Sequence, residues 1–272
     1  MLKYYINLDR STRRREEIEA RCQALGPLYQ LQRFPGVDGV KTPQNNPYLT
    51  DGEWGCYQSH MRLIASCVGL DQDVMILEDD EMFDQSLGNV FLTPDNLPRQ
   101  EWDILYLDMT IMEIEDYLVA TRSIAMGLQN GILPRVVSVP SSMLAFGSHA
   151  YIINRQSVKK VYDLLYDNQN QSLAIDNVYA AAVKDQTIKA MILLPFHCYP
   201  GPETSNSQIG GIKSEILQMA ELFRMGLSMP NYLAKKNNYW AELERITHTA
   251  INARLNFRML EKVDPAMKML KK

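Results

Sequence analysis

The stretch from Val74 to Asp80 reads Val-Met-Ile-Leu-Glu-Asp-Asp, four apolar residues followed directly by three carboxylates. A short unbroken apolar run is typical of a strand that is buried on both faces of a sheet. The acids would then follow the carboxyl end of that strand, where open α/β sheets bind their ligands. Like charges this close repel one another unless a cation lies among them. The stretch therefore predicts a metal and phosphate site, although a solvated acidic turn would have the same pattern.

Strand and helix patterns alternate on both sides of this stretch. We expect further strands at residues 2–8, 28–34, 102–108, 135–139, 143–153 and 187–194. Helices are expected after residue 11 and at 50–68, where Thr50 and Glu53 form a capping box, and at 155–165 and 172–183. This alternation predicts an α/β fold with a mainly parallel sheet.

Two segments lack this alternation. Residues 109–134 have no clear period, and we expect them to form a lid or binding loop. From residue 212 the chain is expected to be helical to its end. The simplest division is one domain over residues 1–211 and a helical C-terminal extension over residues 212–272.

Composition places the chain among soluble globular proteins, with 46% hydrophobic and 22% charged residues in 272. The net charge of -4 does not favour nucleic-acid binding. The four cysteines show neither a CxxC pair nor zinc-finger spacing, which favours free thiols in a reducing compartment. The chain starts in a strand without a signal-peptide pattern, and no apolar run approaches the ~18 residues of a membrane span. We therefore expect a cytoplasmic protein.

Two basic segments allow two interpretations each. From Asn231 onward nine cations face four anions, so this region could lie on an anionic inner membrane or could be a solvated helix surface. Arg13, Arg14 and Arg15 fall in the first turn of a helix, the unfavourable end for cations. They either form a solvated basic face or grip a phosphate, since guanidinium groups suit phosphate oxygens.

Six motifs follow one another along the chain from Leu2 to about Ser207. They are Ile6–Arg10 with Arg14–Arg15, Phe34–Gly39, Gly55–His60, Ile76–Asp80, Trp102–Leu107 and Gly147–Ile153. Each motif is weak by itself, but their order and spacing are specific. In these motifs the chain resembles glycosyltransferase family 25, the lipooligosaccharide (LPS) glycosyltransferases, which include relatives that act on collagen.

This resemblance implies a GT-A-like, Rossmann-like fold, a sugar-nucleotide donor and a divalent cation, Mn²⁺ or Mg²⁺. Its acidic motif corresponds to Glu78 and Asp80, which we expect to bind the metal, and His197 could complete the coordination or be a structural histidine. Asp38 could contact the nucleotide or only form a turn. The expected donor-binding residues are Asn7, Leu8, Asp9, Arg10, Arg14, Asp38, Gly39 and Asp79.

Transfer with inversion needs a general base for the acceptor hydroxyl. Asp176, in the family's Ile-Asp pattern, is the first candidate, and Glu53 and Asp108 are rivals. Asp176 could instead be a helix N-terminal acid that interacts with the helix dipole. His60, inside a predicted helix, is more typical of a structural hydrogen-bond donor.

The resemblance implies an inverting transfer of a hexose, galactose from UDP-galactose, to a lipooligosaccharide acceptor. A metal-dependent phosphohydrolase would use similar acids at a strand end, but would leave the Gly55–His60 motif without a role. A non-catalytic sugar-nucleotide or glycan-binding relative is the third class, and three intact acids argue against it.

Overall fold

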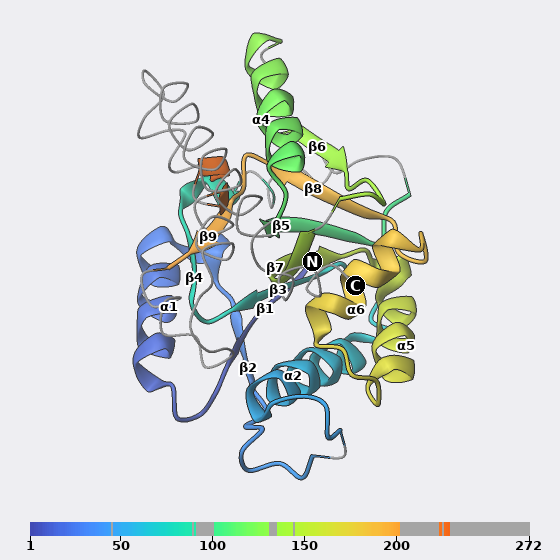
Figure 1. The fold of residues 1–272 in the computed structure, drawn as a ribbon. Coiled ribbons are helices and arrows are strands. Elements are labelled where there is room, and N and C mark those ends of the chain that lie inside the picture. The colour runs from blue at the N-terminus through green and yellow to red at the C-terminus, as the bar shows by residue number, and fades with distance from the viewer. Residues whose placement is uncertain are drawn as a thin grey trace, which may run out of the picture.

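One seven-stranded sheet with helices on both faces forms the centre of the protein (Figure 1). The computed structural model describes residues 1–44, 46–88, 90, 101–130, 135–143, 145–201, 223–224 and 226–228. The strand order is β2-β1-β3-β7-β5-β8-β6, and a separate two-stranded sheet pairs β4 with β9. The predicted α/β class is confirmed.

The sheet strands are β1 (Leu2–Asn7), β2 (Gln32–Pro35), β3 (Val74–Glu78), β5 (Ile104–Ile111), β6 (Arg135–Ser138), β7 (Ala145–Ile153) and β8 (Ala190–Leu194). The small sheet consists of β4 (Glu81–Phe83) and β9 (Cys198–Pro200). The α-helices are α1 (Thr12–Leu25), α2 (Asp51–Cys67), α4 (Ile114–Gln129), α5 (Val158–Asn168) and α6 (Ile175–Lys184). Short 3₁₀ turns are η1 (Pro27–Tyr29), η2 (Gln85–Leu87) and η4 (Arg155–Ser157).

Parallel and antiparallel pairings both occur in the main sheet. Strand β1 is parallel to β2 and β3, and β5 is parallel to β8. Strand β7 runs antiparallel between β3 and β5, and β6 pairs antiparallel with β8. The sheet is therefore mixed, with its parallel half at the β2-β1-β3 end.

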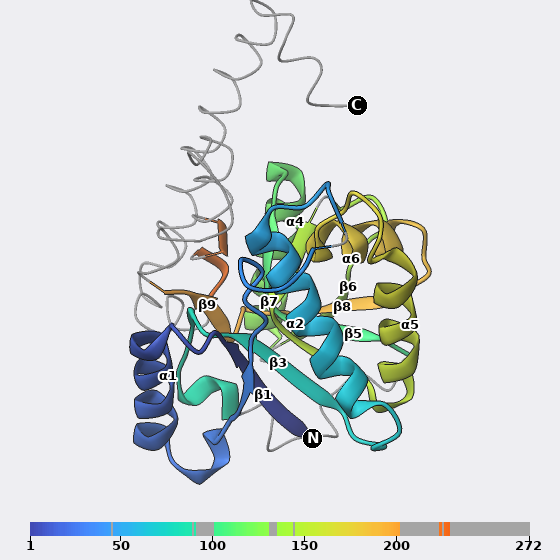
Figure 2. The same ribbon diagram turned by 90° about the horizontal axis from the view of Figure 1, so that it is seen from below.

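Strand β3 is buried on both faces, as its apolar run predicts. Val74 and Ile76 belong to one hydrophobic cluster together with residues of α2, α5 and α6. Met75 and Leu77 belong to a second cluster that includes α1. Figure 2 shows β1 and β3 side by side, with α1 on one side of these strands and α2 and α5 on the other. Alternation of side chains along one strand thus supplies both halves of the core.

The three parallel strands β2, β1 and β3 end at the same edge of the sheet. Asn7 pairs in register with Pro35 on β2, and Ile6 pairs with Glu78 on β3. The segments that follow these strands must therefore meet, although they are far apart in sequence. This edge holds the candidate site.

Two predictions of elements are wrong. Residues 109–134 do not form an irregular lid, because β5 continues to Ile111 and α4 occupies most of the rest. Buried Tyr117, Ala120 and Ile124 have helical spacing, which the surrounding Met, Gly and Asn residues obscured. The predicted strand at 28–34 begins only at Gln32, since Pro27 opens a 3₁₀ turn.

The predicted C-terminal extension lies largely outside the described residues. Within it, Phe223, Arg224 and Leu227 are buried against the domain. The division at residue 211 therefore stays a prediction. Among the described residues, no helix is both long and apolar enough to cross a lipid bilayer.

Candidate active site

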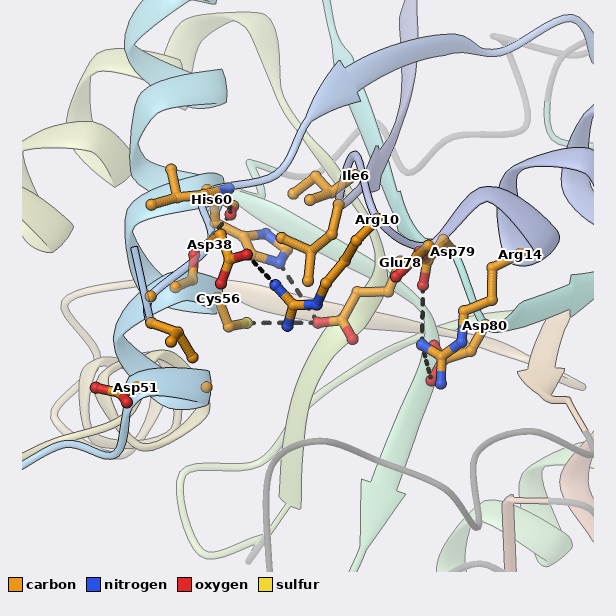
Figure 3. Close-up of a pocket in the computed structure, with 18 of the residues that line it drawn as sticks. Ile6, Arg10, Arg14, Asp38, Asp51, Cys56, His60, Glu78, Asp79 and Asp80 are labelled. Atoms are coloured by element: carbon orange, nitrogen blue, oxygen red, sulfur yellow. Dashed lines mark hydrogen bonds and ion pairs between the residues drawn. The ribbon is translucent and has the colours of Figure 1, made fainter. Parts of the chain in front are cut away.

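A cavity of about 500 Å³ opens at the carboxyl ends of β1, β2 and β3 (Figure 3). Its walls come from the β1–α1 connection, the loop after β2, the first turns of α2 and the acids after β3. The predicted site residues that line it are Leu8, Arg10, Arg14, Asp38, Gly39, Glu78, Asp79 and Asp80. Its volume is in the range of small-molecule binding sites.

Two glycines let the loop after β2 lie against helix α2. A Cβ atom on Gly39 would lie 1.7 Å from the Asp51 carbonyl oxygen, and one on Gly55 would lie 2.6 Å from the Val37 oxygen. Ser59 Oγ accepts a hydrogen bond from Val37 N at 2.7 Å and donates to the Gly55 carbonyl oxygen at 2.6 Å. These backbone contacts explain why the motifs containing Gly39 and Gly55 occur together.

This packing places Asp38 on the cavity wall beside Arg10 (Figure 3). The two side chains form an ion pair. The hydrogen bond from the Arg10 guanidinium holds the pKa of Asp38 below its ordinary value. Asp38 is therefore ionised at neutral pH and can accept hydrogen bonds from a ligand.

Asp79 is held in place by the buried side-chain amide of Asn7. Asn7 Nδ2 donates to Asp79 Oδ2 at 2.6 Å, and Arg14 Nη1 lies 3.0 Å from Asp79 Oδ1 and 3.5 Å from Asp80 Oδ2. Burial raises the pKa of Asp79 and of Asp80, and the negative charge of Glu78 raises that of Asp80 further. Arg14 thus faces two carboxylates at the floor of the cavity.

The side chain of Glu78 is directed toward residues of α2 and β7. Its Oε1 atom lies 3.4 Å from His60 Nε2 and accepts from Ser148 Oγ at 3.3 Å, while Oε2 lies 3.9 Å from His149 Nδ1. Burial alone would raise the pKa of Glu78, but the neighbouring His149 and His60 hold it below its usual range. Burial opposes protonation of His149, yet the carboxylate of Glu78 raises the pKa of that imidazole to about 9.

Six predicted site residues lie outside the cavity lining: Asn7, Asp9, Glu53, Asp108, Asp176 and His197. Asn7 is buried beneath Asp79, whereas Asp9 is exposed and pairs with Arg33. Glu53 completes the predicted capping box, because its carboxylate accepts from Thr50 N at 2.8 Å.

The remaining candidates are buried to different degrees. Asp176 lies in the first turn of α6, and its Oδ1 atom is buried without a hydrogen bond from the described residues. His197 is fully buried between β8 and β9, with Nδ1 2.9 Å from the Pro195 carbonyl oxygen. Asp108 is also fully buried, and Arg224 Nε donates to it at 2.9 Å.

Sequence reasoning did not identify Cys56 and His60 as neighbours of Glu78. Both side chains line the cavity and face Glu78 from adjacent turns of α2. Their spacing of four residues on a predicted helix was the available signal, because residues i and i+4 lie on the same face. The partner Glu78 comes from another element and could not be identified from spacing.

The donor atoms at the cavity floor suit a hard divalent cation. Asp80 and Glu78 offer carboxylate oxygens, which Mg²⁺ and Mn²⁺ prefer. The raised pKa of Asp80, caused by burial and by the charge of Glu78, indicates excess negative charge that a cation would compensate. Asp80 and Glu78 are therefore compatible with the divalent cation that the sequence predicts.

Two curated proteins and one family model are similar to this chain. The chain is 31% identical over 124 residues to a "Glycosyltransferase 25 family member" of Drosophila pseudoobscura pseudoobscura, covering 38% of this chain and 20% of the relative. A protein of the same description from Anopheles gambiae is 28% identical over 134 residues, covering 42% and 22%. The chain thus spans about a fifth of the length of these curated relatives. A model of the family described as "Glycosyltransferase family 25 (LPS biosynthesis protein)" matches residues 1–179, and the chain therefore belongs to glycosyltransferase family 25.

Proposed function

We propose that this chain is a metal-dependent glycosyltransferase that moves galactose from UDP-galactose to a lipooligosaccharide acceptor. The main support is the cavity in which Arg14, Asp79 and Asp80 meet at the ends of three parallel strands. Membership of the family supports glycosyl transfer. The choice of acceptor follows the family's description as an LPS biosynthesis protein. The choice of galactose follows from the resemblance alone.

The donor diphosphate would lie over the acids at the end of β3. Asp80 and Glu78 would hold Mn²⁺ or Mg²⁺, which when bound neutralises charge on the departing nucleotide diphosphate. Arg14 lies beside the same acids and would orient phosphate oxygens. Asp38 is ionised and lies on the cavity wall beside Arg10. It would accept a hydrogen bond from the ribose or the base of the donor nucleotide.

Asp176 is our candidate for the general base. Its buried Oδ1 atom has no hydrogen-bond partner among the described residues, which supports this role, although the residue lies outside the cavity lining and the acceptor would have to reach it. Burial and Arg224 lower the pKa of His149, Glu78 raises it, and the negative charge of Asp176 raises it further by a smaller amount. Glu53 is the weaker candidate, since its carboxylate is already engaged with Thr50.

The acceptor lipid would bring the enzyme to the inner membrane from the cytoplasmic side. The basic region from Asn231 onward, which lies outside the described residues, would supply the contact through its excess of cations. Flotation with anionic vesicles, compared between the full chain and a chain ending at residue 230, tests this contact. Equal flotation of the two would remove the membrane role.

Turnover assays separate the proposed function from its alternatives. The full chain is incubated with Mn²⁺, a panel of UDP-hexoses and a lipooligosaccharide lacking its terminal hexose. We expect UDP release that depends on acceptor, is fastest with UDP-galactose and yields a β-linked product. Asp176→Asn should lower kcat about 10²–10⁴-fold with little change in donor affinity, whereas Asp163→Asn, exposed on α5, should not.

Each other outcome of that assay contradicts a defined part of the proposal. Phosphate release without acceptor would favour a phosphohydrolase, and donor binding without turnover of any sugar would favour a non-catalytic relative. Full activity of Asp176→Asn would exclude this residue as the base. A product with retained configuration would exclude direct displacement.

A further inference from the structure

Three chemically different side chains meet on the side of the cavity away from Arg14 (Figure 3). Cys56 and His60 lie on adjacent turns of α2, and Glu78 ends β3. One ligand atom from each lies within 4.8 Å of the other two. Glu78 Oε1 is 3.4 Å from His60 Nε2 and 3.7 Å from Cys56 Sγ.

Two of these separations agree with the geometry of a tetrahedral metal site. Zinc binds imidazole nitrogen and carboxylate oxygen at about 2.1 Å and thiolate sulfur at about 2.3 Å. In a tetrahedron these bond lengths place oxygen about 3.4 Å from nitrogen and about 3.6 Å from sulfur. The two distances from Glu78, 3.4 Å and 3.7 Å, are close to these values.

The hydrogen bonding of the His60 imidazole also indicates that a ligand is missing. The residue is 1% exposed, and its Nε2 atom lies 3.4 Å from Glu78 Oε1 but makes no hydrogen bond in the described part of the chain. Its Nδ1 atom lies 2.8 Å from Tyr151 Oη, and the two rings stack. If Nδ1 donates to Tyr151, the Nε2 lone pair points to Glu78 and Cys56, as in histidines oriented for metal binding by an outer hydrogen bond.

We propose that Cys56, His60 and Glu78 form a binding site for Zn²⁺. A thiolate with an imidazole favours zinc over Mg²⁺ or Mn²⁺, which prefer oxygen ligands. Binding replaces the thiol proton of Cys56 by the metal and releases that proton to water, with no change of oxidation state. Three protein ligands leave one position for water or a ligand oxygen, and the cavity supplies the space.

This site differs from the one proposed for the donor metal. It needs neither donor nor acceptor, and Asp80 and Arg14 are not part of it. Glu78 is common to both, so zinc would take this carboxylate away from the oxygen-ligated cation. Zinc is therefore expected to weaken the activation of the transferase by Mn²⁺.

Cobalt replaces zinc as a visible probe in the test. The reduced full chain is titrated with Co²⁺ in a thiol-free buffer, and its near-ultraviolet and visible absorption is recorded. We expect a thiolate-to-cobalt charge-transfer band that saturates at one equivalent and disappears when one equivalent of Zn²⁺ is added. The Cys56→Ser variant should lose the band, and His60→Gln should need at least tenfold more Co²⁺ to produce it.

Controls make the test specific. Cys67 is a buried thiol on the same helix, so Cys67→Ser should keep the band. Asp80→Asn should also keep it, which separates this site from the donor metal whether or not the transferase proposal holds. Circular dichroism checks the fold of each variant, and zinc should raise the Tm of the parent but not of Cys56→Ser. Absence of the band in the folded parent, or its persistence in Cys56→Ser, would overturn the proposal.

Discussion

Three adjacent carboxylates at the end of β3 have three different surroundings. Glu78 faces His60 and His149, Asp79 is held by Asn7 and Arg14, and Asp80 lies 3.5 Å from the Arg14 guanidinium. Because their partners differ, the three acids can serve different purposes within one short motif. Both oxygens of Asp79 already have partners, Asn7 and Arg14.

Asp103, in another motif of the family, has a structural role. Its carboxylate accepts from Ser157 Oγ at 2.6 Å, Lys160 Nζ at 2.7 Å and Lys189 N at 2.7 Å. Burial alone would raise its pKa, but these hydrogen bonds lower it. A carboxyl with a lowered pKa stabilises the fold above its unfolded-state value, about 4, and this stabilisation is lost as pH falls below it.

Asp103→Asn should therefore destabilise the protein in a pH-dependent way. We expect the free energy of unfolding to fall by about 2 kcal/mol near pH 7, from weakened charge-assisted hydrogen bonds. The difference from the parent should persist above about pH 4 and narrow as pH falls below that value, through the lowered pKa of Asp103. Urea unfolding at several pH values measures it, with exposed Glu101→Gln as the control of small effect. A difference that does not change with pH would contradict this role.

At the residue scale, the sequence predicted which residues lie in the site better than it predicted the individual contacts of each side chain. The resemblance implies that Leu8, Arg14 and Asp80 belong to one donor site, and all three line the cavity. The contact of Cys56 with Glu78 depends on how α2 is rotated over the sheet. That rotation is set by tertiary packing, which local periodicity does not determine.

At the scale of elements, the site depends on one close approach between a loop and a helix. Residues 36–39 lie against the first turns of α2, where Gly39 and Gly55 leave no room for a side chain. The sequence predicted α2 and its capping box, and both are confirmed. It did not predict α4, whose helical spacing became visible only with its buried positions.

Gly55→Ala should separate this loop from the helix. The added methyl would lie 2.6 Å from the Val37 carbonyl oxygen, and backbone must move to admit it. We expect the free energy of unfolding to fall by about 1–3 kcal/mol and donor affinity to fall with it, because Asp38 moves. Urea unfolding and a thermal-shift titration with UDP measure the two effects. Ala65→Ser, on the exposed face of the same helix, is the control, and an unchanged Gly55→Ala would contradict the close approach.

At the scale of the whole molecule, a distant segment is tied to the sheet by a buried arginine. Arg224 is 3% exposed and pairs with Asp108 on β5 and Glu81 on β4, which are 0% and 2% exposed. Beside it, Phe223 stacks on Tyr117 of α4 with ring centroids 4.3 Å apart. The sequence placed this segment in a separate extension, since contacts across more than a hundred residues leave no local pattern.

Arg224→Leu should destabilise the entire domain. It leaves two buried carboxylates without their cation, which costs about 3–5 kcal/mol for groups of this kind. Guanidinium unfolding of the Arg224→Leu variant measures the effect. The control is Lys159→Ala, which removes an exposed ion pair on α5 worth no more than ~0.5 kcal/mol. A decrease of less than about 1 kcal/mol in the free energy of unfolding would show that Arg224 does not anchor this segment to the sheet.

The most direct test of the donor site is the affinity of the full chain for UDP-galactose, measured by calorimetry with and without Mn²⁺. If Asp80 holds a cation against the diphosphate, binding should require Mn²⁺, and Asp80→Asn should weaken it at least tenfold, or about 1.4 kcal/mol. The matched Asp163→Asn variant should bind as the parent does. Equal affinity of Asp80→Asn and parent, or binding indifferent to Mn²⁺, would contradict a metal-bridged donor in this cavity.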